Sequence, residues 1–140
     1  AVAGWTTFAS QCTSCHRLTG MTDPSDPAKE FEYPEVVNQV SGEAPNLAHF
    51  MSRTTFAGAK FDLRKDTDEC VALGQDWALS EDGIADCLDR NALEAWLRNP
   101  PAQKAMHPGE TPAPESRGMP NFNLTEEQID DLVAFLTGLE

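Results

Sequence analysis

The clearest pattern of hydrophobic and polar positions lies at the C-terminal end of the chain. Thr125 is a typical helix N-cap, and Gln128, three residues later, completes a capping box. Leu124 and Ile129 have the spacing of a hydrophobic staple across the same helix start. Hydrophobic residues then recur at helical spacing, at Ile129, Leu132, Val133, Phe135, Leu136 and Leu139. The pattern predicts an amphipathic helix that begins after Thr125.

A second helix is predicted at the other end, over residues 3–14, where Trp5, Phe8 and Cys12 share one face. Gly4 carries no side chain, so another helix could cross closely there. A third helix is predicted to open at Asn91, with Glu94 completing a capping box. It carries Leu93, Trp96 and Leu97 and ends before Pro100-Pro101.

Proline, glycine and short polar residues dominate the remaining segments. Residues 17–42 and 99–118 are predicted to be long loops, the first with a turn of helix near Pro34–Gln39. An ordered turn is predicted at residues 44–47 and a short helix over 49–56. No alternating strand pattern of useful length is present. The sequence therefore predicts an all-α fold with few helices and long loops, which leaves little core for the length of the chain.

The pentapeptide Cys12-Thr13-Ser14-Cys15-His16 is a CxxCH motif, the attachment signature of a c-type haem. Two thiols three residues apart can each add to one vinyl group of the same porphyrin. The histidine that follows them can then serve as the proximal ligand of the iron. The motif predicts one covalently bound haem c, because the chain contains one CxxCH.

Two other uses of a CxxC pair are less well supported. A structural zinc site needs a second ligand pair at matching spacing, and Cys70 and Cys87 are not so paired. A thioredoxin-like redox motif should follow a strand in a βαβ pattern, which the sequence does not show.

Length and charge limit the class of protein further. The chain has 140 residues, which favours one domain, and no apolar run approaches the ~20 residues needed to span a bilayer. Its net charge is −13, which argues against nucleic acid and anionic membranes as partners. Eight acids fall between Asp66 and Asp89; they form either a solvated face or a docking surface for a basic partner.

His16 leaves one axial position of the iron for another side chain. The candidates are Met21, Met51, Met106, Met119, His49 and His107. We favour Met119, because Gly118-Met119-Pro120 places a thioether on a stiffened loop just before the last helix. Met106 and His107 remain rivals in the same proline-rich loop. Ligation by histidine and methionine would raise the reduction potential and leave no open position for a substrate, as in an electron carrier.

These features together resemble a class I cytochrome c. The resemblance rests on Gly4, Phe8, the CxxCH motif, a Pro-Asn-Leu turn, a Met-Pro loop and an amphipathic last helix. Residues 44–53, 93–100 and 119–124 are most similar to the cytochrome c domain fused to subunit II of caa-type cytochrome c oxidases. The matching parts cover roughly half of the chain.

The resemblance implies a role for each site residue. Cys12 and Cys15 would form the thioethers, and His16 and Met119 would be the axial ligands. The carbonyl of Pro45 would accept a hydrogen bond from the second nitrogen of His16. Two further residues would lie near the haem propionates, although ordinary helix packing explains the second equally well; they are Arg53 and Trp96.

The chain departs from the family pattern over about residues 57–90, which we interpret as an insertion in a single mono-haem domain spanning 1–140. Cys70 and Cys87 lie in this segment, and a disulfide between them is the simplest interpretation. Such a bond and covalent haem both imply an oxidising, extracytoplasmic compartment. A targeting or membrane segment is then expected upstream, removed or belonging to a longer protein.

The function predicted from the resemblance is electron transfer. The donor would be a quinol-cytochrome c oxidoreductase or a small cytochrome, and the acceptor the copper centre of the chain's own oxidase. This domain alone would catalyse no reaction. The alternatives are a freestanding periplasmic carrier, a cytochrome module of another reductase, and a haem enzyme or sensor with an open iron site.

Overall fold

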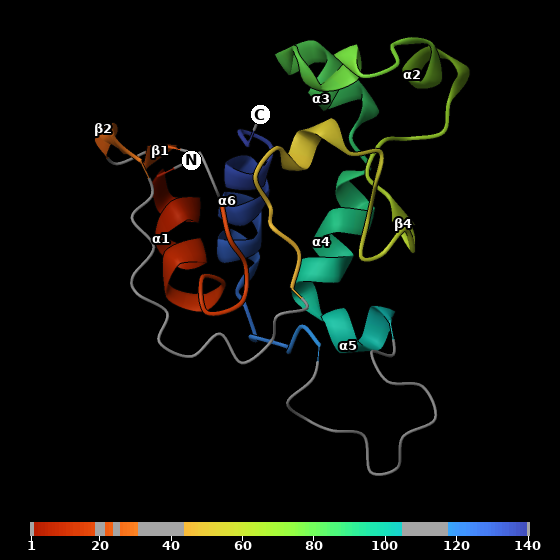
Figure 1. The fold of residues 1–140 in the computed structure, drawn as a ribbon. Coiled ribbons are helices and arrows are strands. Elements are labelled where there is room, and N and C mark those ends of the chain that lie inside the picture. The colour runs from red at the N-terminus through yellow and green to blue at the C-terminus, as the bar shows by residue number, and fades with distance from the viewer. Residues whose placement is uncertain (1, 19–21, 24–25, 31–43, 105–117, 140) are drawn as a thin grey trace.

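The computed structural model describes residues 2–18, 22–23, 26–30, 44–104 and 118–139. Helices dominate this part of the chain (Figure 1), and no helix within it is long and apolar enough to cross a membrane. The α-helices are α1 (Val2–Gln11), α2 (Asp68–Ala72), α3 (Glu81–Cys87), α4 (Arg90–Arg98), α5 (Pro100–Gln103) and α6 (Glu126–Leu136). Two single 3₁₀ turns accompany them, η1 (Phe50–Ser52) and η2 (Asp76–Ala78).

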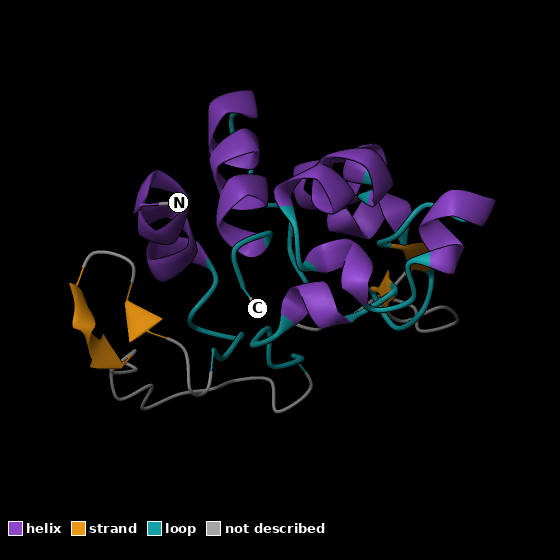
Figure 2. Ribbon diagram, turned by 90° about the horizontal axis from the view of Figure 1, so that it is seen from above, coloured by secondary structure: helices purple, strands orange, loops and turns teal. Residues whose placement is uncertain are grey.

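Two short antiparallel hairpins were not predicted. One pairs β1 (Thr22–Asp23) with β2 (Asp26–Glu30), and the other pairs β3 (Thr55–Phe56) with β4 (Phe61–Asp62). Figure 2 shows the β1–β2 pair on the α1 side of the molecule, away from the second hairpin. The strands are too short to give an alternating pattern that sequence reasoning could detect. The predicted helical turn at Pro34–Gln39 lies outside the described residues.

The first and last helices pack against each other at Gly4, as predicted. A Cβ atom built on Gly4 would lie 2.0 Å from the carbonyl oxygen of Asp131 and 2.6 Å from Cβ of Phe135. Phe8 packs beside this crossing, with its ring centroid 5.2 Å from that of Phe135. The buried residues of α6 match the predicted face, and its capping box is formed by Thr125 and Gln128.

Replacing Gly4 with alanine should therefore destabilise the protein. The new methyl group would meet backbone atoms that cannot turn aside, so we expect a loss of about 3 kcal/mol or more in the free energy of unfolding. Urea denaturation measures this loss. Gly138→Ala is the matched control, because its Cβ would make only an ordinary contact at 3.5 Å. Equal losses in both variants would contradict the close crossing.

The start of α4 differs from the prediction. Asp89, not Asn91, caps this helix, and its carboxylate accepts a hydrogen bond from the amide of Ala92 at 3.0 Å. Glu94 bonds to Arg90 instead of completing a capping box. The predicted end is confirmed in part: α4 stops at Arg98, but Pro100 opens α5 as its first residue, where its missing N–H costs nothing.

The predicted helix over residues 49–56 is wrong. Only Phe50–Ser52 form a 3₁₀ turn, and the chain then enters β3. His49 adopts a left-handed backbone conformation (φ 53°), which an α-helix cannot include. Phe50 and Met51 are buried in the core at this turn, so tertiary packing determines the conformation of the segment.

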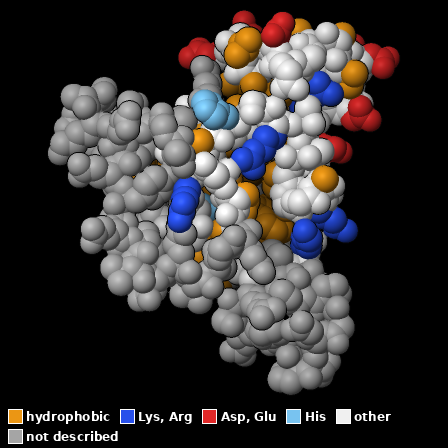
Figure 3. Space-filling view, in the orientation of Figure 1, with side chains coloured by type: hydrophobic (Ala, Val, Ile, Leu, Met, Phe, Trp, Pro, Cys, Tyr) orange, Lys and Arg blue, Asp and Glu red, His pale blue; other side chains and the backbone are white. Residues whose placement is uncertain are grey.

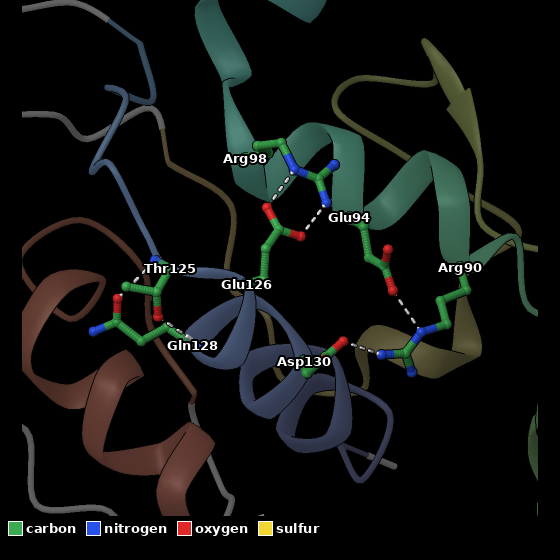
Figure 4. A network of polar contacts seen from close by, with 7 residues as sticks. All are labelled: Arg90, Glu94, Arg98, Thr125, Glu126, Gln128 and Asp130. Atoms are coloured by element: carbon green, nitrogen blue, oxygen red, sulfur yellow. Dashed lines mark hydrogen bonds and ion pairs between the residues drawn. The ribbon is translucent and has the colours of Figure 1, made fainter.

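Ion pairs on the surface connect α4 to α6 (Figure 4). Arg98 donates two hydrogen bonds to Glu126, at 2.9 and 2.6 Å, and these bonds hold the pKa of Glu126 below its usual value. Arg90 bridges Glu94 and Asp130 in the same way. Exposed pairs of this kind contribute little stability; they link the two helices at two places.

The segment predicted to be an insertion contains the second hairpin and a compact unit, residues 66–87, which we call the α2–α3 lobe. Cys70 and Cys87 form the predicted disulfide, with Cα atoms 5.5 Å apart. Their side chains are buried, and Trp77 in the same unit is fully buried. The lobe lies at the top of Figure 1, above the N-terminal end of α4.

Removing this disulfide should lower stability without changing the rest of the fold. The bond closes a loop with a sequence separation of 17 residues, so the double variant Cys70→Ser/Cys87→Ser should lose about 3 kcal/mol of unfolding free energy. Chemical denaturation with and without a reductant measures the loss. An unchanged midpoint on reduction of the wild type would show that the bond does not stabilise the fold.

Candidate functional site

One cavity of about 460 Å³ lies between α1, α4, α6 and the two chain segments that connect them. Figure 3 shows hydrophobic side chains in a hollow near the middle of this face, with Lys and Arg side chains close by. The cavity brings together all of the predicted site residues. They are Cys12, Cys15, His16, Pro45, Arg53, Trp96 and Met119.

The CxxCH motif lies in a turn that continues the last turn of α1. The amide of Cys12 donates to the carbonyl of Phe8 at 2.8 Å, and the carbonyl of Cys12 accepts from the amides of Cys15 and His16, at 3.1 and 2.8 Å. The helix therefore ends at Gln11 rather than at the predicted residue 14, but helical bonding extends through the motif. This turn directs both thiols and the imidazole toward one cavity.

The imidazole of His16 is held by the backbone of Pro45. Its Nδ1 lies 2.9 Å from the Pro45 carbonyl oxygen. A carbonyl can only accept, so Nδ1 carries the hydrogen and Nε2 keeps its lone pair for a metal. The predicted hydrogen bond is thus confirmed. Burial lowers the pKa of His16, the bond to Pro45 opposes that shift, and Arg53 adds to it. The neutral, ligating form is favoured.

The Cys12 thiol is also held in its neutral form. Burial, and to a smaller extent the charge of Cys15, raises the pKa of Cys12 to about 12. The free thiol is therefore neutral at pH 7, which disfavours thiol–disulfide exchange at this position. Cys70 and Cys87 are bonded to each other, so they are not the missing half of a zinc site.

Met119 is the one described candidate for the second axial ligand that lines the cavity. Gly118, with φ 94°, makes the turn that precedes it. Met51 is only 1% exposed in the core and does not line the cavity, and His49 is exposed outside it. The remaining candidates lie outside the described residues; they are Met21, Met106 and His107.

Arg53 and Trp96 line the cavity but also have structural contacts. The guanidinium of Arg53 donates to the carbonyl of Asn46 and lies 6.0 Å from the centre of the Phe50 ring. Trp96 packs against Phe56 and Phe61, with centroids 6.3 and 5.9 Å apart. Their predicted place beside haem propionates therefore stays a prediction, compatible with their position.

Sequence reasoning missed a second cation at the cavity. Lys104 lines it and donates from Nζ to the carbonyl of Ala57 at 2.8 Å. Ala57, Gly58 and Ala59 are all left-handed, so the turn between β3 and β4 is tightly coiled at this wall. Lys104 follows two prolines in a segment predicted to be a loop, and nothing local indicates a partner 47 residues away.

The residues of the cavity fit a c-type haem. Two thiols and a ligating imidazole lie at one wall, and a thioether lines the same space. The remaining lining is mostly apolar, and it includes Phe8, Leu93, Leu97 and Leu132. An apolar pocket of several hundred Å³ with a few convergent polar groups is typical of a cofactor site.

A comparison with protein families matches residues 81–140 to the family described as Cytochrome c. The matched range covers less than half of the chain and includes α4, Met119 and α6, but not the CxxCH motif. Comparisons with curated proteins and with solved structures give no significant match. The matched C-terminal part and the haem-attachment motif meet at one cavity, and together they support a c-type cytochrome that carries covalent haem c.

Proposed function

We propose that this cytochrome transfers electrons through a haem iron ligated by His16 and Met119, and that it delivers them to the copper centre of a haem-copper terminal oxidase. The observation that carries the ligation is the cavity itself. Within the described chain, an oriented imidazole and a thioether line the same space from the turn that follows α1 and from the segment before α6. When bound, the haem supplies a reversible one-electron couple.

The protein's own residues set the conditions for that couple. The Pro45 carbonyl fixes the orientation of His16 and raises its basicity. The thioether of Met119 favours the reduced metal and so a high potential. Apolar side chains from α1, α4 and α6 line the cavity. With both axial positions filled, the iron would have no open position for a substrate, which suits a carrier rather than a catalyst.

Delivery to an oxidase is supported by the sequence resemblance. Residues 44–53, 93–100 and 119–124, which resemble the cytochrome domain of oxidase subunit II, all contribute side chains to the cavity wall. The disulfide in the lobe supports an extracytoplasmic location. The donor would be a quinol-cytochrome c oxidoreductase or a small cytochrome.

The full-length gene product tests the oxidase assignment. We expect two membrane spans and a copper-ligand motif upstream of Cys12, and stopped-flow oxidation of the reduced haem domain by the purified copper-binding domain. A cleavable signal peptide as the only upstream element, with no electron transfer to that copper domain, would make the protein a freestanding carrier instead.

A further inference from the structure

The α2–α3 lobe displays hydrophobic side chains that its own core does not use. Among the described residues, four large hydrophobic side chains are strongly exposed. Three of these four lie inside the lobe, in the nine-residue stretch 71–79. Val71 and Leu73 are 45% and 43% exposed, and Leu79 is 69% exposed. The lobe nevertheless buries Trp77 completely and is closed by a disulfide. These exposed residues are therefore not the result of an unfolded or frayed segment.

The charge of the lobe is of one sign. Residues 66–87 contain seven acids and no Lys or Arg, so this segment holds −7 of the net charge of −13. All seven are exposed, and no ion pair in the described part of the chain includes them. They are Asp66, Asp68, Glu69, Asp76, Glu81, Asp82 and Asp86. Figure 3 shows hydrophobic side chains among these acids at the top of the molecule.

Helix capping explains only part of this charge. Four of the acids occupy the first turns of α2 and α3, where the helix dipole favours them. Asp76 begins the short 3₁₀ turn η2, and Asp66 and Asp86 lie in no first turn. Two cations contact the lobe and leave it with a net charge of −5: Arg64 donates to the carbonyl of Gly74 and Lys65 to that of Asp86. Both hold the lobe in place through its backbone.

We infer that the lobe is a docking surface for a membrane-bound redox protein with a basic surface around an apolar patch; this inference rests on the electron-transfer function proposed above. Exposed Val71, Leu73 and Leu79 would supply the apolar contact, and the acids the charge complementarity. A second copy of this chain is a poorer occupant, because two acidic lobes repel each other.

The position of the lobe predicts which kinetic step it controls. None of residues 59–92 lines the haem cavity, whereas Phe56, Ala57, Gly58 and Leu93 on either side of that range do. The lobe therefore holds the partner without forming the path to the haem. Changes to it should weaken association and leave the maximal electron-transfer rate unchanged.

The test uses the reduced holoprotein and membranes of the source organism, with oxidation followed optically and binding measured by cosedimentation. Leu79→Ser and, separately, the double variant Asp66→Asn/Asp76→Asn should raise the concentration of holoprotein that half-saturates the membranes about threefold to tenfold. The maximal rate of oxidation should stay the same. In the double variant, this half-saturating concentration should also depend less on the salt concentration. Val2→Ser, which alters the fourth exposed hydrophobic residue, and Asp62→Asn/Glu127→Gln are the matched controls.

The outcomes separate the two proposals. Rapid oxidation with the same half-saturation in lobe and control variants overturns the docking surface and leaves the carrier function intact. Absence of oxidation in the wild type overturns the proposed delivery of electrons, and cosedimentation with the membranes then tests the docking surface by itself. Binding that is lost only in the lobe variants supports the docking surface. Equal binding in all variants, or no binding by the wild type, overturns it. A wild-type dimer that Leu79→Ser abolishes would assign the surface to self-association and overturn the inference.

Discussion

The double variant Cys12→Ser/Cys15→Ser should contain no covalently attached haem. Both thiols line the cavity beside His16, and a serine hydroxyl cannot form the thioether that attaches the porphyrin. Mass spectrometry of the denatured wild type should show the polypeptide plus one haem, and that of the variant the polypeptide alone. The loss should be complete, because no other described cysteine lines the cavity.

The second cysteine pair provides a control for this experiment. Cys70→Ser/Cys87→Ser removes the same number of sulfur atoms from a disulfide in the α2–α3 lobe. This variant should keep its haem and lose only stability. If it lost haem to the same extent, or if the Cys12/Cys15 variant retained a covalent adduct, the CxxCH motif would not be the attachment site.

Replacing Met119 with alanine should have the second-largest effect. The thioether would be removed from the cavity, and the reduction potential should fall by on the order of 0.1 V or more, within the ~0.8 V range that axial ligands span. Redox titration measures the change. The variant should also bind carbon monoxide in the reduced state, because one axial position would be open.

Met51→Leu is the matched control for Met119→Ala. Met51 is buried in the core, does not line the cavity and can be replaced by leucine at a cost below about 1.5 kcal/mol. Its potential should match that of the wild type. An unchanged reduction potential in Met119→Ala would exclude Met119 as a ligand and leave Met106 and His107 as candidate axial ligands.

Local rules predicted the parts of the fold whose determinants are close in sequence. In α6, the capping box and the apolar stripe lie within 15 residues, and both are present in the structure. At α4, Asp89 and Asn91 are both good caps, and local sequence could not choose between them. In the structure Asp89 is the cap, and its carboxylate accepts a hydrogen bond from the amide of Ala92.

The same distinction applies to the site. The CxxCH spacing is a local pattern, so Cys12, Cys15 and His16 were predictable from chemistry alone. Met119 was favoured for its place in the loop before the last helix, and Pro45, Arg53 and Trp96 were named through a family resemblance. The structure places all four at the same cavity. Lys104 could not be predicted, because its contact with Ala57 depends on how two distant segments pack.

The optical spectrum of the purified ferric holoprotein tests the central claim, a closed haem ligated by His16 and Met119, most directly. We expect the weak far-red band of an iron–sulfur bond, its loss in Met119→Ala, and no carbon monoxide binding by the reduced wild type. Ready binding of carbon monoxide by a wild type that lacks this band would contradict the account, and would place the protein among haem enzymes or sensors.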